Sequence, residues 1–77
     1  MATSVKQAIH ENDVVELTQP VAKTQEAGYW PAGTSGTVIA EHDQHKLIEI
    51  SDADNYGAML DMVSETEDRL KLVEKHS

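Results

Sequence analysis

The chain has 77 residues, a length that fits one small domain with a thin hydrophobic core. It contains no cysteine, which excludes disulfides, thiolate metal sites and cysteine nucleophiles. A net charge of −8 disfavours binding to nucleic acid or to an anionic membrane surface.

The hydropathy pattern contains no apolar run of the roughly 18 residues that cross a membrane, and the first residues lack the apolar core of a secretory signal. We therefore expect a soluble cytoplasmic protein. The acidic charge is uneven, because residues 41–77 carry ten acidic and four basic side chains. This bias either steers a basic partner towards the protein or serves solubility alone.

The chain divides into a polar extension over residues 1–12, a globular part over 13–74 and a short tail over 75–77. In the extension, Val5, Ala8 and Ile9 have the spacing of one or two helical turns. A segment this short is not stable alone. It either frays or docks through Ile9.

Short β-branched runs separated by polar turns predict five strands. A long loop over 18–35 follows the first strand, and an acidic turn over 64–68, in which Ser64 could cap one helical turn, precedes the last. Gly33 and Gly36 predict a tight turn into the second strand. The expected strands are 13–17, 36–41, 46–51, 58–63 and 69–74.

Alternation along these strands predicts which side chains face inward. The expected core is Val15, Leu17, Val38, Ala40, Ile48, Ile50, Leu60, Met62, Leu70 and Leu72. Asp61 is expected to face outward, as are Leu47, Met59, Val63 and Val73. This outward apolar stripe is covered by the extension, forms a partner surface, or reflects a register error of one residue.

Five short strands without a long helix predict an all-β fold, and closure into a small barrel would remove exposed strand edges. The sequence resembles SH3-like barrels in the order of its elements: "DVVELT" from Asp13, a long loop, "PAGTSGTVI" from Pro31, then "LIEI", "LDMV" and "RLKLV". It is similar in particular to a family of small bacterial proteins of unknown function. Members are often encoded beside predicted toxins, so the resemblance implies an antitoxin or immunity role.

The sequence motifs that could bind a metal ion or catalyse a reaction are weak matches to known sites. His42, Asp43 and His45 could ligate a metal, but their position in a hairpin turn favours a solvated turn. The Asp52–Gly57 segment resembles the start of a calcium loop, but its fifth and twelfth positions, Tyr56 and Val63, are not ligands. We therefore expect no catalytic residue, no cofactor and no bound metal.

Tyr29 and Trp30 form the most distinctive pair in the long loop. Such residues are enriched at interface hot spots, and aromatic loops of SH3 folds bind extended ligands. Trp30 either forms an exposed contact or folds back as a lid over the core.

These observations favour a non-enzymatic binding protein that neutralises a basic, toxin-like partner, as a monomer or weak homodimer. The alternative is an accessory or scaffold subunit of a larger enzyme. A metal-dependent role of His42 and His45 is a weaker option. The expected partner-binding residues are Tyr29, Trp30, Glu41, Asp43, Asp52, Asp54, Asp61, Glu65, Glu67 and Asp68.

Overall fold

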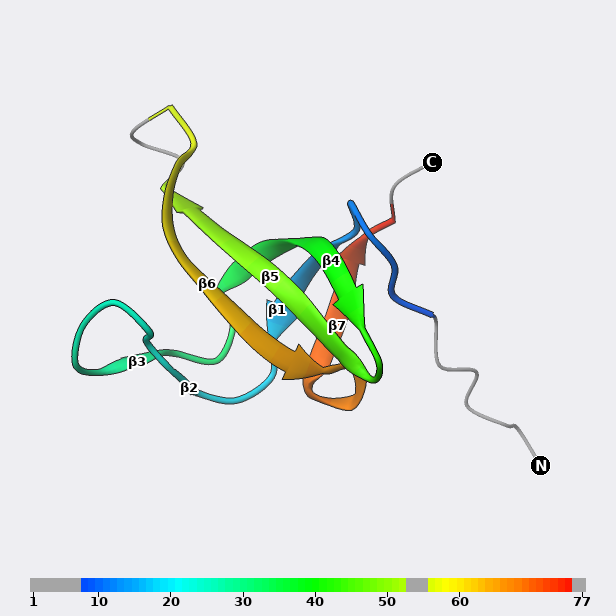
Figure 1. Ribbon diagram of the computed structural model, residues 1–77, viewed down its shortest axis with the longest axis horizontal. Helices are drawn as coiled ribbons and strands as arrows, with labels where there is room; N and C mark the ends of the chain where they lie inside the picture. The colour runs from blue at the N-terminus through cyan, green and yellow to red at the C-terminus, as the bar shows by residue number, and fades with distance from the viewer. Residues whose placement is uncertain (1–7, 53–55, 76–77) are drawn as a thin grey trace.

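The structure is a computed structural model that describes residues 8–52 and 56–75. It is mostly β, with seven strands and one short 3₁₀ helix among these residues (Figure 1). The strands are β1 (Val14–Leu17), β2 (Val21–Ala22), β3 (Tyr29–Trp30), β4 (Ser35–His42), β5 (His45–Asp52), β6 (Ala58–Thr66) and β7 (Leu70–Glu74). The 3₁₀ helix, η2, spans Glu67–Arg69.

Five strands form one antiparallel sheet in the order β6-β5-β4-β1-β7. The sheet is strongly curved, and the β2–β3 hairpin lies to one side of it (Figure 1). The expected all-β fold and the five main strands are thus confirmed. A closed barrel is not, because no pairing joins the end strands β6 and β7 among the described residues.

The expected long loop over 18–35 is partly ordered as a hairpin. Val21 pairs with Trp30 and Ala22 with Tyr29, and the amide of Lys23 donates to the carbonyl of Gly28 at 3.0 Å. Two-residue strands are too short to show an alternating pattern, which is why the sequence did not indicate them.

The buried core cluster is aliphatic. Of the expected core residues, Leu72 is half-buried and packs against the cluster. Ile9 is also buried, at 2% exposure, so the end of the extension docks onto the curved sheet. Residues 8–12 form no helical turn, and Val5, the first residue of the expected turn, lies outside the described residues. The buried apolar residues are Ile9, Val15, Leu17, Val38, Ile48, Ile50, Val63 and Leu70.

The prediction of which β6 side chains face the core is wrong. Asp61 lies opposite Ile50 and Val63 opposite Ile48, and cross-strand partners point to the same face of a sheet. Because both isoleucines are buried, Asp61 and Val63 point inward, each 1% exposed. Their neighbours Leu60 and Met62, expected in the core, are exposed instead.

A β-bulge explains why Ala40 also leaves the expected core. The register shifts between Val38 and Ala40, so that Val38 lies opposite Ile48 whereas Ala40 lies opposite the outward-facing Leu47. An extra residue in one strand reverses the phase of everything after it. Ala40 is therefore only half-buried.

Two turn predictions also need correction. Strand β6 continues to Thr66, which precedes η2 without a side-chain cap, so Ser64 is not an N-cap. Gly33 has the positive φ expected of the turn, at +92°. Gly36 lies in strand β4 as expected, but β4 begins at Ser35 and Gly36 has no positive φ, so the turn ends before it. Gly36 is required for close packing, because a Cβ there would lie 2.4 Å from Ile48 Cγ2 and 2.9 Å from the Glu49 carbonyl oxygen.

Candidate functional site

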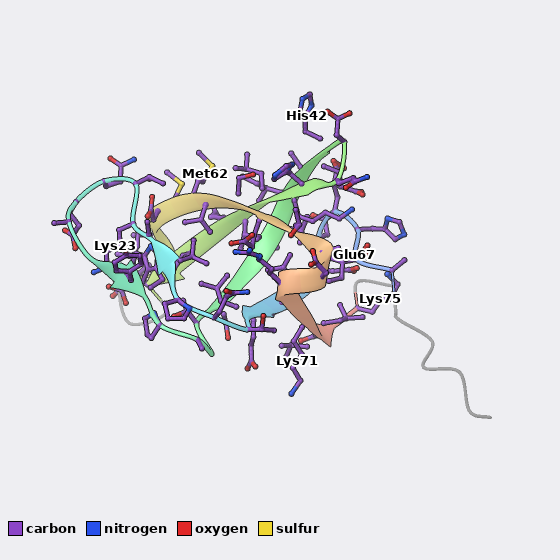
Figure 2. All side chains as sticks on the ribbon, turned by 90° about the horizontal axis from the view of Figure 1, so that it is seen from below. Lys23, His42, Met62, Glu67, Lys71 and Lys75 are labelled. Atoms are coloured by element: carbon purple, nitrogen blue, oxygen red, sulfur yellow. The ribbon has the colours of Figure 1, made fainter. Side chains whose placement is uncertain are left out.

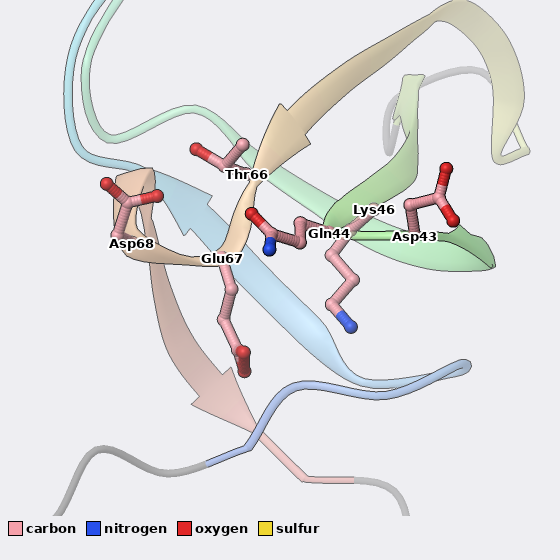
Figure 3. A pocket seen from close by; sticks show the side chains of 6 residues that line it. All are labelled: Asp43, Gln44, Lys46, Thr66, Glu67 and Asp68. Atoms are coloured by element: carbon pink, nitrogen blue, oxygen red, sulfur yellow. The ribbon is translucent and has the colours of Figure 1, made fainter.

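An acidic pocket of about 310 Å³ lies where the β4–β5 turn meets the end of β6 and the start of η2 (Figure 3). The pairing of His45 with Thr66 brings these two turns together. The residues that line the pocket are Asp43, Gln44, Lys46, Thr66, Glu67 and Asp68. Three of them are carboxylates expected to bind a partner, and Asp43 and Asp68 lie at opposite ends of the pocket in Figure 3.

The single lysine of the pocket is already engaged. Lys46 is buried along its length, and its Nζ lies 2.7 Å from Glu41 Oε1. The hydrogen bond from Lys46 lowers the pKa of Glu41, a direction that burial opposes and the positive charge of Lys46 reinforces. The positive charge of Lys46 is therefore compensated by Glu41, and the three carboxylates give the pocket an excess of negative charge.

The carboxylates of the pocket differ in their structural roles. Glu67 Oε2 accepts the amide of Ile9 at 2.7 Å, so this side chain also fixes the N-terminal segment. Asp43 and Asp68 are solvent-exposed. Asp43 has a positive φ of +56°, a conformation that Asp and Asn tolerate better than most residues.

Other expected site residues are not gathered in the pocket. Glu65 accepts the amide of Thr66 and lies 3.9 Å from Arg69 Nε. Asp52 ends strand β5, beyond the strand residues that reach the pocket. Asp54 lies outside the described residues.

Asp61 is the residue whose role sequence reasoning missed. Its Oδ2 accepts the backbone amide of Thr24 at 2.9 Å and Trp30 Nε1 at 2.8 Å, and its Oδ1 accepts the Thr24 hydroxyl and the amide of Met62. Burial raises the pKa of Asp61, but these hydrogen bonds outweigh burial and lower it to about 2. A carboxylate at this position is therefore ionised and holds the β2–β3 hairpin against the sheet; it is not part of an exposed acidic surface.

The two aromatic residues of the hairpin point in different directions. Trp30 is half-buried and packs against the core, and the Nζ of Lys23 lies 4.6 Å from its ring centroid. Trp30 therefore folds back over the core, which is the lid alternative of the two expected for it. Tyr29 is 67% exposed.

The described residues show no cluster of potential metal ligands. In the described part of the chain no group of three or more His, Cys, Asp or Glu side chains could hold a metal ion, and His42 lies with Asp43 on an exposed turn. Within residues 8–52 and 56–75 no helix has the length and apolarity needed to cross a membrane.

Comparisons with protein-family models, with curated proteins and with solved structures found no match.

Proposed function

We propose that the chain is a non-enzymatic protein-binding module whose acidic pocket receives Lys or Arg side chains of a basic partner. The observation that carries this proposal is the pocket of about 310 Å³ with three carboxylates, in which Glu41 compensates Lys46, the one cation among the described lining residues. A guanidinium or ammonium group entering there gains charge-assisted hydrogen bonds. The net charge of −8 attracts such a partner over a longer range.

We further propose that the fold is a small SH3-like barrel and that the partner is toxin-like, as the sequence resemblance implies. Strand β1, the long connection to β4, the β4-β5-β6 meander and the return of β7 beside β1 support the fold proposal. Occupation of basic residues in a toxin would neutralise it by blocking the surface that contacts its target. Non-enzymatic binding needs no deeper cleft than the one present.

The experiment is co-expression with the proteins encoded beside this chain, followed by affinity capture at low salt. The pocket variant is Asp43→Asn with Asp68→Asn, which removes two charges but leaves Glu67 bound to Ile9. The control is Glu16→Gln with Glu74→Gln, which removes the same charge on β1 and β7. We expect the pocket variant to capture less of the partner than the wild type and the control to capture the same amount. Failure of the wild type to capture any basic protein would refute the proposal.

A further inference from the structure

Strand β6 presents a group of exposed apolar side chains that the acidic pocket does not use. We name Met59, Leu60 and Met62 the β6 patch; they are 52%, 44% and 37% exposed. The inward phase of Asp61 and Val63 sets Met62 outward, and the register shift near Ser51 accommodates Leu60 as an extra residue of β6. Figure 2 shows Met62 projecting away from the ribbon of β6. Neighbouring exposed apolar residues on one strand are typical of a contact surface.

A small hollow of about 90 Å³ adjoins the patch. It lies between Leu60 on β6 and Trp30 on the hairpin, and Lys23 and Glu26 form part of its wall. The hydrogen bonds of Asp61 to Thr24 and Trp30 hold this wall in place. One apolar side chain of a partner could enter the hollow while its neighbours cover Met59 and Met62.

The charges around the patch indicate the chemistry of that partner. Glu49 lies opposite Met62 in the sheet and Asp52 lies opposite Ala58, and these two carboxylates form an acidic rim beside the patch. Lys23, the basic residue of the hollow, is 3.1 Å from Glu26. A second copy of this chain would bring one acidic rim against another, which costs free energy. A partner with Lys or Arg flanking its apolar side chains is complementary to this rim.

The backbone of β6 favours contact through its face over addition of a strand at its edge. Strand β6 is the last in the sheet order, so its outer amides are open to pairing in principle. However, the amide of Met62 donates to Asp61 Oδ1 at 2.8 Å, and that of Thr66 donates to Glu65 Oε1 at 3.2 Å. Amides already bound to carboxylates are poor donors to an added strand.

We infer that the β6 patch and the adjoining hollow form a second contact surface, which binds apolar side chains flanked by Lys or Arg on a protein partner. This inference rests on the proposed function, because both surfaces would contact one basic partner. It adds an apolar contribution that the acidic pocket cannot supply, and methionine side chains adapt well to such partners.

The test uses two peptides of equal charge, Ac-Lys-Leu-Lys-Leu-Lys-NH₂ and Ac-Lys-Ser-Lys-Ser-Lys-NH₂. The full chain, labelled at its methionine methyl groups and backbone amides, is titrated with each by NMR. We expect the leucine peptide to shift the methyl signals of Met59 and Met62 and to bind at least fivefold more tightly than the serine peptide. The variant Leu60→Gln with Met62→Gln should abolish this difference. The matched control is Val73→Gln, an exposed apolar residue on β7.

The possible outcomes separate the two proposals. If both peptides shift only the amides of Gln44, Thr66 and Asp68, the β6 patch is not a contact surface but the acidic pocket is. If neither peptide shifts any signal, both the β6-patch inference and the acidic-pocket proposal fail. If the chain self-associates with rising concentration and Leu60→Gln with Met62→Gln prevents this, the occupant is a second copy and the inference is overturned.

Discussion

The indole Nε1 of Trp30 donates to the buried carboxylate of Asp61 at 2.8 Å, which joins the hairpin of the long loop to the edge strand of the sheet. Thr24 strengthens the same junction with its amide and hydroxyl. Since Asp61 is only 1% exposed, its charge is stable there only because these donors replace water. The junction orients Trp30 and thereby one wall of the hollow beside Leu60.

Replacing Asp61 with Asn should destabilise the protein by about 2–4 kcal/mol. Each oxygen of Asp61 accepts from an N–H group, Trp30 Nε1 or the amide of Met62. The amide nitrogen of Asn must therefore meet a donor in either orientation. Urea unfolding followed by circular dichroism measures the change. Glu74→Gln, an exposed acidic residue on β7, is the control and should change stability by less than about 0.5 kcal/mol.

The same carboxylate predicts a pH dependence. The pKa of Asp61 falls from 3.8 to about 2 on folding, so its contribution is fully present above the unfolded value and is lost as the pH falls from about 4 towards 2. The fluorescence of Trp30, the only tryptophan, reports on the junction directly. We expect a wild-type fluorescence transition in this range that is absent from Asp61→Asn. Identical pH profiles for the two proteins would contradict the assignment.

Gly36→Ala should cost about 1–3 kcal/mol, the usual cost of inserting a methyl group into a packed interface. The added Cβ would collide with Ile48 Cγ2 and the carbonyl oxygen of Glu49. Backbone strain is not the cause, because Gly36 lacks the positive φ of Gly33. Ser35→Ala, at an exposed position in the same strand, should be close to neutral in thermal unfolding. Equal melting temperatures for the two variants would exclude the close-approach explanation.

Docking of the N-terminal segment is tested by Ile9→Ala. We expect a loss of about 2–4 kcal/mol, because Ile9 is buried in the core. Val73→Ala removes two methyl groups from a half-exposed side chain and should cost much less in the same denaturant titration. A small effect of Ile9→Ala would mean that the segment is dispensable for folding.

The strands could largely be predicted from sequence, because β-branched residues and alternation mark β4, β5 and β7. The phase of β6 could not. The run from Leu60 to Val63 can bury either alternate pair, and burial of Asp61 becomes favourable only through donors on Thr24 and Trp30, more than thirty positions away. Local patterns do not contain such distant partners.

The candidate site was predictable in composition but not in arrangement. Acidic residues were expected to form one broad surface, yet only Asp43, Glu67 and Asp68 of that set line the pocket. Their proximity follows from the pairing of His45 with Thr66, so the strand register was the missing information. The engagement of Lys46 by Glu41 likewise depends on the pairing of those two residues across β4 and β5.

The central claim, that the acidic pocket binds a basic partner, is tested most directly by the dissociation constant of the captured complex at low and physiological salt. We predict that Asp43→Asn with Asp68→Asn weakens binding by about five- to tenfold at low salt and reduces its salt dependence, because two exposed carboxylates no longer attract the partner. Glu16→Gln with Glu74→Gln should leave the short-range contacts intact and change the constant by less than about twofold. Equal dissociation constants for the wild type and the pocket variant at both salt concentrations would contradict the account.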